Sequence, residues 1–354
     1  MHIGVTLPSR TGPIASVGEK ARRAEEAGFH SVFGYEVYRN PFNLMTAAAL
    51  ATERVTLGTG LAAAFSRSPF EAANAAADID DISGGRMFFG IGTGVPEFLR
   101  AFHSTDAKHP LGRLSEYIDV LRLSWEYLAT GKSESLDGQH YQFVAPPINP
   151  WGERELPRTS IPIALAAMGP KLVELCGQKA DAWIGYFATT KYVNEFVRPH
   201  LEAGAKKAGR DPSEVQICAE AVCSVSPDRE LAMSRARKQV GFYATHPAGA
   251  QVAAMHGLED AVTELRRNFA REGIAAFERT DDRLVETLSI TGTPEEARQK
   301  LAQYEGVIDH LVLHTPYVPP IEAEESEDAF ANILDTFGGI ARAAEETSAV
   351  GARA

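Results

Sequence analysis

Short apolar segments that read as buried strands alternate with amphipathic helical segments along almost the whole chain. The first pair is the strand pattern 2–7 and the helical pattern 16–28, and the last is the strand pattern 308–317 and a helix at 327–346. Such alternation is typical of a parallel sheet, because each helix returns the chain to the same edge. About eight units, without a dinucleotide-binding fingerprint in the first turn, favour a (β/α)8 TIM barrel over an open sheet.

Two segments interrupt this rhythm. Residues 131–160 are rich in proline and glycine and contain a possible hairpin, DGQHYQF, at 137–143. Residues 242–286 are irregular and partly helical. We interpret both as insertions rather than linkers, so the sequence predicts a single domain that spans 1–354.

Charge and cysteine content restrict the partners. The formal net charge is −12, which argues against nucleic acid or an anionic membrane as a partner. The three cysteines are too few for a disulfide framework and suit a reducing, cytoplasmic location. The chain opens directly as a strand, with no signal-peptide pattern, and no stretch approaches the roughly 18 apolar residues of a membrane span. A small molecule is the expected partner.

In a (β/α)8 barrel, chemistry belongs at the carboxyl ends of the strands. Two of these ends, the GTG of 58–60 and the GIGTG of 90–94, have almost no side chains. Glycine there allows a flat ligand to approach the backbone, although it also simply permits a bulge. GIGTG is not a dinucleotide fingerprint, because Val95 stands where a third glycine belongs and the motif follows a fourth strand.

A third strand end lacks bulky side chains and leads into a helix at 166–171. Gly169 is placed to be the N-cap, and Pro170 at the first helical position loses only an amide that would lack a partner anyway. The amides of Met168, Gly169 and Lys171 are therefore candidates to bind one phosphate, assisted by the helix dipole. Simple helix capping explains the same residues.

Three side chains at strand ends are the catalytic candidates. Glu36 ends the second strand, Glu97 follows the fourth, and His314 ends the eighth. Each has an ordinary alternative, as a salt-bridged loop carboxylate, a first-turn helix acid and a buried histidine. Glu220 lies in the middle of a strand and, if it faces inward, needs a buried partner. Asp78, Asp80 and Asp81 do not converge at helical spacing, so no metal site is expected.

Four stretches together resemble the luciferase-like monooxygenase superfamily, in its branch of flavin- and deazaflavin-dependent oxidoreductases. They are LGTG (57–60), SGGRMFFGIGTG (83–94), AAMGPKLVELCGQKADAWI (166–184) and ITGTPEEARQKL (290–301), and GFYATHPAGAQVAAMHG (241–257) resembles a segment of actinobacterial members. The resemblance implies a TIM barrel with insertions and a cofactor ring across the carboxyl-end mouth. It also implies that the protein is a homodimer.

The resemblance also implies where the cofactor is held. The bulge behind the ring, often with a non-prolyl cis peptide, maps to about Gly60-Leu61, and Thr93 and Gly94 form a further contact loop. The phosphate maps to Ala167, Met168 and Gly169, with Pro170 and Lys171 following, and Glu36 matches an acid after strand two. The chain departs from the pattern at Val37, which replaces a frequent histidine, and at Val95, which replaces the glutamate of sugar-phosphate dehydrogenases.

The resemblance leaves the cofactor and reaction partly open. AAMGPK is more similar to the deazaflavin branch, so hydride transfer between coenzyme F420 and an organic substrate is the leading hypothesis. An FMN-dependent monooxygenase and a cofactor-binding protein without turnover are alternatives. The polyglutamate tail of F420 requires basic residues, and Trp151, Phe242 and Tyr243 of the insertions suggest an apolar substrate. The basic candidates are Arg10, Arg39, Arg67, Arg113 and Lys171.

Overall fold

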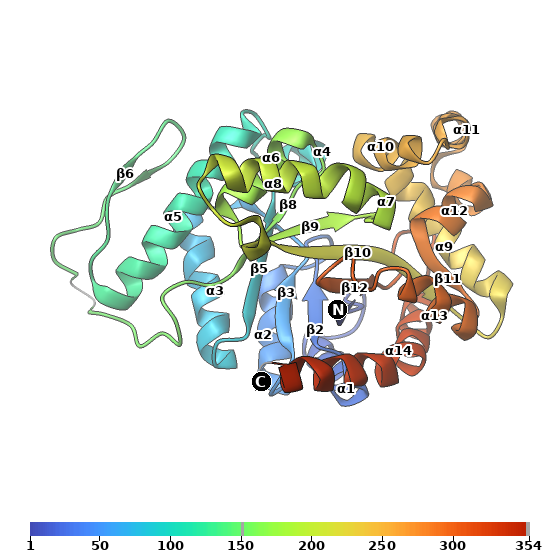
Figure 1. The fold of residues 1–354 in the computed structure, drawn as a ribbon, viewed down its shortest axis with the longest axis horizontal. Helices are drawn as coiled ribbons and strands as arrows, with labels where there is room; N and C mark the ends of the chain where they lie inside the picture. Colours follow the sequence, from blue (N-terminus) through green and yellow to red (C-terminus); the bar gives the residue numbers. More distant parts are fainter. Residues whose placement is uncertain (150–151, 352–354) are drawn as a thin grey trace. The chain divides into compact units, whose positions relative to one another are not determined.

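The computed structural model describes residues 1–149 and 152–351 and is drawn in Figure 1. The chain forms two compact units that are each made of several stretches of sequence. Unit 1 comprises Met1–Val32, Gly185–Pro199 and Gln216–Ala354, and unit 2 comprises Phe33–Ile184 and His200–Val215. That the whole chain is one domain stays a prediction.

The strands follow the apolar segments of the sequence. In chain order they are β1 (His2–Thr6), β2 (Ser31–Gly34), β3 (Thr56–Thr59), β4 (Ala62–Ala63), β5 (Met87–Gly92), β6 (Leu136–Asp137), β7 (Gln142–Phe143), β8 (Ile163–Ala166), β9 (Ala182–Tyr186), β10 (Gln216–Val225), β11 (Ser289–Gly292) and β12 (His310–His314).

Helices connect these strands. The α-helices are α1 (Ala15–Ala27), α2 (Pro41–Ala51), α3 (Pro69–Ser83), α4 (Pro96–Phe102), α5 (Pro110–Thr130), α6 (Pro170–Lys179), α7 (Thr190–Tyr192), α8 (Arg198–Lys207), α9 (Arg229–Ala244), α10 (Pro247–Met255), α11 (Glu259–Glu272), α12 (Asp282–Leu288), α13 (Pro294–Ala302) and α14 (Ala323–Gly351). Shorter helical turns are η1 (Ala64–Ser66), η2 (Val193–Val197), η3 (Pro212–Glu214) and η4 (Gly273–Arg279). In the described residues, no helix is both long enough and apolar enough to cross a membrane.

The strand order confirms the predicted fold class. The large sheet runs β11-β10-β12-β1-β2-β3-β5-β8-β9, and β9 also pairs with β10. The registered pairs of β1 with β12 and of β5 with β8 are parallel. This is the cyclic order of a (β/α)8 barrel, in which consecutive strands are neighbours and the helices return the chain.

The first insertion contains the predicted hairpin. In unit 2, β6 and β7 pair antiparallel, with Leu136 opposite Phe143. Figure 1 shows this hairpin beside α5, away from the parallel strands of unit 2. Trp151, which the sequence suggested for the substrate side, lies outside the described residues.

The second insertion is mostly helical. It spans the end of α9, then α10, α11, η4 and α12, all within unit 1. The sequence pattern missed β11, which pairs with the carboxyl-terminal part of β10 from Val222 to Val225, whereas Cys218 to Val222 of β10 pair with β12. The ten-residue β10 therefore pairs first with β12 and then with β11 along its length.

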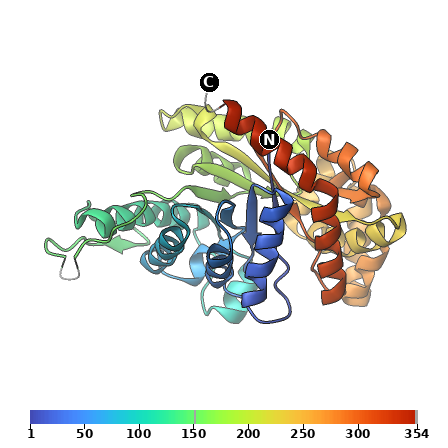
Figure 2. The same ribbon diagram turned by 90° about the horizontal axis from the view of Figure 1, so that it is seen from below.

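Within unit 1, the last helix lies against the first, as Figure 2 shows. Gly28 ends α1 with a φ of 105°, which favours glycine, and its amide donates to the carbonyls of Ala24 and Glu25. A Cβ on Gly28 would lie 2.8 Å from the Cβ of Arg342 on α14. The glycine that ends the helix therefore also permits the close packing of α14.

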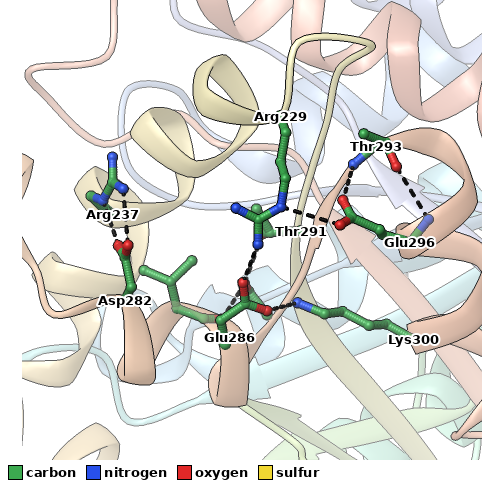
Figure 3. Close-up of polar contacts among 10 residues, drawn as sticks. Arg229, Arg237, Asp282, Glu286, Thr291, Thr293, Glu296 and Lys300 are labelled. Carbon is green, nitrogen blue, oxygen red and sulfur yellow. Dashed lines mark hydrogen bonds and ion pairs between the residues drawn. The ribbon is translucent and has the colours of Figure 1, made fainter.

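An ion-pair cluster joins α9, α12 and α13 in unit 1 (Figure 3). Arg229 lies 2.6 Å from Glu286 and 3.2 Å from Glu296, and Lys300 lies 2.6 Å from Glu286. Thr293 and Glu296 form a capping box: Thr293 N–H donates to Glu296 Oε2 at 2.8 Å, and Glu296 N–H donates to Thr293 Oγ1 at 3.4 Å. The cap thus fixes one of the acids that Arg229 binds.

Replacing Thr293 with alanine should lower the free energy of unfolding by about 1 kcal/mol, because an amide in the first turn of α13 loses its acceptor. Thr263→Ala in α11 is the matched control, since Thr263 only bonds back to the carbonyl of Glu259 from an exposed helix position. Urea unfolding of both variants checks this. Equal losses in the two variants would contradict the capping interpretation.

Candidate functional site

In unit 2, a short break with a cis peptide separates β3 from β4. The Gly60-Leu61 bond between β3 and β4 is cis, where the resemblance placed a non-prolyl cis peptide. Gly60 N–H donates to the carbonyl of Gly34 at 2.9 Å, and the Leu61 carbonyl accepts from Glu36 N–H at 3.3 Å. The break is therefore held against the end of β2.

Three strand ends of unit 2 meet at this point. A Cβ added to Gly92 would lie 2.9 Å from Leu61 Cδ2 and 3.0 Å from Ala166 Cβ, and one on Gly94 would lie 3.1 Å from Ala63 Cβ. The ends of β3–β4, β5 and β8 are thus in contact, with small side chains and Leu61 filling the space over the glycines, and most of their residues are partly exposed. We call residues 60–61, 92–94 and 166–169 the bare strand ends, and a flat ligand can approach main chain there.

The turn before α6 provides amides for an anion. Gly169 is the N-cap with φ −90° and ψ 155° and Pro170 is at N1, as predicted, and no side chain caps this end. The Ala167 carbonyl accepts from the indole N–H of Trp183 at 2.6 Å, which fixes the turn. The first amides of a helix have no acceptor within it, and a Cβ on Gly169 would meet nothing within 4 Å. This open cradle fits a phosphate group, with Lys171 exposed beside it.

Glu36 is paired rather than free. Its carboxylate accepts from Arg67 Nη2 at 2.7 Å and Nη1 at 3.0 Å, and from the amide of Ala63 at 2.7 Å. Both side chains are largely buried, 12% exposed for Arg67 and 13% for Glu36. Burial opposes the charge of Arg67, yet its pKa is raised by the hydrogen bond to Glu36 and by its carboxylate charge. The geometry favours Glu36 as a group that positions the chain after the cis peptide.

The other two catalytic candidates differ in exposure. Glu97 on α4 has a 73% exposed side chain and an ion-pair distance of 3.7 Å to Arg100. His314 at the end of β12 belongs to unit 1 and is buried. Among the basic candidates for the polyglutamate tail, Arg67 is bound to Glu36, and Arg113 stacks 3.9 Å from the ring centre of Phe65 and donates to Asp106 O. The roles of these residues stay predictions.

His314 lies in an aromatic cluster of unit 1. Its ring centre is 5.1 Å from that of Tyr186 and 5.5 Å from that of Tyr317. Burial lowers the pKa of His314 to about 4, and a hydrogen bond to the Thr315 carbonyl only partly offsets this. At neutral pH the imidazole is therefore uncharged, so that it can exchange hydrogen bonds but does not supply a positive charge.

Gln239 fixes this cluster, and the sequence analysis did not single it out. Its Nε2 donates to the Tyr186 hydroxyl at 3.0 Å, and its Oε1 accepts from the amides of Tyr317 and Val318 at 2.9 and 3.0 Å. Tyr243 stacks on Tyr186 with ring centres 3.9 Å apart, and its hydroxyl lies 2.5 Å from that of Tyr317. We call Tyr186, Gln239, Tyr243, His314 and Tyr317 the tyrosine cluster. Gln239 is fully buried on α9. A polar residue among the apolar positions of this helix is the one signal in the sequence that could have identified it.

Comparison with known proteins gives a consistent family. Residues 1–310 match the model of a family described as luciferase-like monooxygenase. The chain is 28% identical to a 5,10-methylenetetrahydromethanopterin reductase of Methanolobus tindarius over 87% of this chain and 92% of the relative. It is also 28% identical to an F420-dependent glucose-6-phosphate dehydrogenase of Mycolicibacterium fortuitum, over 84% and 88%. Both relatives are named as oxidoreductases.

A solved structure supports the fold independently. The coenzyme F420-dependent tetrahydromethanopterin reductase of Methanopyrus kandleri superposes with a TM-score of 0.78, covering 95% of this chain and 97% of that chain. The identity is 22%, so this likeness concerns the fold alone.

Proposed function

Because the chain belongs to the luciferase-like monooxygenase family, we propose that it is an F420-dependent oxidoreductase that transfers a hydride between the deazaflavin and an organic substrate. One observation carries the proposal: the bare strand ends of unit 2 adjoin an open helix N-terminus. These are a surface for a flat ring and a cradle for its phosphate, in one unit. The hydride chemistry belongs to the cofactor when it is bound.

The residues of the chain bind and orient the cofactor. Leu61, which covers Gly92, would lie against the ring, with Gly60, Thr93 and Gly94 shaping the main chain beside it. The amides of Met168, Gly169 and Lys171 would bind the phosphate, and the dipole of α6 favours its charge. Glu36 would keep the segment after the cis bond in place through Ala63 and Arg67. His314 stays a catalytic candidate that would offer an uncharged imidazole within unit 1.

The alternative is an FMN-dependent monooxygenase. The description of the family as a monooxygenase favours it, and FMN carries a phosphate that the same amides would bind. Titrating the purified protein with F420, its reduced form and FMN, followed by absorbance and fluorescence, separates the two cofactors. Tight FMN binding with oxygen consumption and no F420 binding would replace the leading proposal by this alternative.

Gly169→Asp should weaken cofactor binding without weakening the fold. Aspartate is a better N-cap than glycine, and φ −90° with free space around the Cβ admits it. Its carboxylate would occupy the first-turn amides and repel the phosphate, so the dissociation constant should rise at least about tenfold, the loss of one charged hydrogen bond.

Gly169→Asn is the matched control for Gly169→Asp, because asparagine caps the helix equally well without the charge. The asparagine variant should lose clearly less affinity than the aspartate variant, and both should unfold at or above the wild-type denaturant concentration. Unchanged cofactor affinity in Gly169→Asp would remove the phosphate site from α6.

A further inference from the structure

Glu220 of β10 is a buried acid that none of the proposed steps uses. Its side chain belongs to unit 1, the residue is 7% exposed, and its Oε1 has no hydrogen-bond partner among the described residues. A buried polar atom without a partner costs about 1–3 kcal/mol, and a leucine or methionine of similar volume would avoid that cost. Packing alone therefore does not explain an acid at this position.

Glu220 faces the interior of the barrel. In unit 1, Ser31 Oγ of β2 lies 2.7 Å from His310 Nε2 of β12. The two side chains meet over Gly4 of β1, where a Cβ would lie 2.1 Å from Ser31 Oγ and 3.1 Å from His310 Nε2. Side chains of strands on either side of β1 converge only on the concave face. In the register of β10 with β12, Cys218 pairs with His310 and Glu220 with Val312, and alternation places both on this face.

The tyrosine cluster lies one side-chain layer further along. Two residues beyond Glu220 on the same face, Val222 pairs with His314, whose ring packs on Tyr186 and Tyr317. Tyr243 and Tyr317 share a hydrogen bond of 2.5 Å in which either oxygen can be the donor. The titratable groups around Glu220 are Cys218 on β10, His310 and His314 on β12, Asp309 before it, Tyr186 on β9, Tyr243 on α9 and Tyr317 after β12.

Glu220 and His314 have pKa values that are shifted in opposite directions. Burial raises the pKa of Glu220 to about 8, whereas burial lowers the pKa of His314 to about 4. The pKa of Tyr243 is raised well above 10 by burial first, and then by charges that include Tyr317, Tyr186 and Glu220. The protonation of Glu220 and the state of the tyrosine pair therefore influence each other.

We propose that Glu220 is a positioning residue that stores one proton for the Tyr243–Tyr317 pair. Through this pair, the proton becomes available to the side-chain layer of unit 1 that contains Val222 and His314. The use of this proton rests on the proposed function. When a substrate oxygen beside this layer of unit 1 gains a proton, the phenol that gives the proton is restored from its partner, and the pair from Glu220. The Glu220 O–H bond breaks, the carboxylate remains, and water later returns the proton. The two electrons of the hydride would come from reduced F420, which would thereby be oxidised.

Infrared difference spectroscopy of the cofactor-free protein tests the storage step directly. The carbonyl stretch of a protonated carboxylic acid should be present at pH 7, should disappear with a midpoint near pH 8, and should be missing in Glu220→Gln. Tyr243→Phe should move that midpoint by about half a pH unit or more, an equilibrium change of about threefold. Tyr304 is another buried tyrosine of unit 1 and lies outside the tyrosine cluster. The control variant Tyr304→Phe should therefore leave the midpoint unchanged.

The outcomes separate this inference from the proposed function. No protonated-acid band at pH 7, or a midpoint that Tyr243→Phe does not move, overturns the inference whatever cofactor the protein binds. If Tyr243→Phe fails to fold, Tyr317→Phe gives the same reading, because it removes the other hydroxyl of the pair. A different outcome overturns the proposed function only: neither the wild type nor any variant binds F420, while the protonated-acid band is present and Tyr243→Phe still moves its midpoint.

Discussion

Replacing Arg67 with methionine is expected to lower the free energy of unfolding by about 3–5 kcal/mol, because it leaves the Glu36 carboxylate buried without its cation. Glu36 is 13% exposed and receives two hydrogen bonds from Arg67, at 2.7 and 3.0 Å. After the substitution, the backbone amide of Ala63 is the main remaining donor. Urea unfolding at pH 7 measures the loss.

Two further variants isolate the buried charge as the cause. The double variant Glu36→Gln/Arg67→Met removes both charges and should recover most of the lost stability. Arg22→Met is the matched control: its partner Glu19 is 2.6 Å away, but the side chains are 52% and 57% exposed, so the change should stay within about 0.5 kcal/mol. A loss below about 1 kcal/mol in Arg67→Met would contradict the assignment of Glu36 as a buried, paired acid.

The second large effect is a loss of stability in mild acid. Burial, with His2 as a second cause, lowers the pKa of His30 from 6.5 to about 4, burial lowers that of His314 to about 4, and burial lowers that of His310 well below 6.5. Between pH 6.5 and about 4 the unfolded chain therefore binds more protons than the folded chain. Stability falls as the pH drops through this window, by up to about 1.4 kcal/mol per pH unit for each histidine.

Glu220 opposes this fall. Its folded pKa of about 8 lies above the ordinary 4.5, so between these values the folded chain holds a proton that the unfolded chain has lost, and stability rises as the pH drops. Three histidines against one acid leave a net loss of up to about 3 kcal/mol per pH unit below pH 6. The half-buried His30 contributes less than the other two, because solvent screens it.

Unfolding curves between pH 7 and pH 5 check the balance of these groups. His314→Gln should flatten the dependence on pH by about one proton, and Glu220→Gln should steepen it by about one proton, because the opposing group is gone. Burial opposes the charge of Glu116, but hydrogen bonds from backbone amides lower its pKa. Paired carboxylates of this kind titrate at more acidic pH, so they do not change the slope of stability between pH 7 and pH 5. Stability that does not change from pH 7 to pH 5 in the wild type would contradict the neutral, buried histidines.

Much of the fold could be predicted because local patterns fixed it. The alternation of apolar and helical segments identified the barrel strands. The helical pattern 16–28 matches α1, which begins one residue earlier, after Ile14 as the N-cap, and has Gly28 as its C-cap. The strand β11 was missed, because its four residues pair only with an extension of β10.

The sequence by itself determined the residues that must be small or must cap a helix: the glycines at 58–60 and 90–94, and Gly169-Pro170 before α6. These properties depend on backbone conformation, which neighbours in sequence control. Only the tertiary structure decided that Leu61, Gly92 and Ala166 touch and that Glu36 is bound by Arg67. It also decided that Glu220 Oε1 has no hydrogen-bond partner among the described residues. Pairing and burial depend on side chains that converge from distant strands, and no local pattern encodes which of them meet.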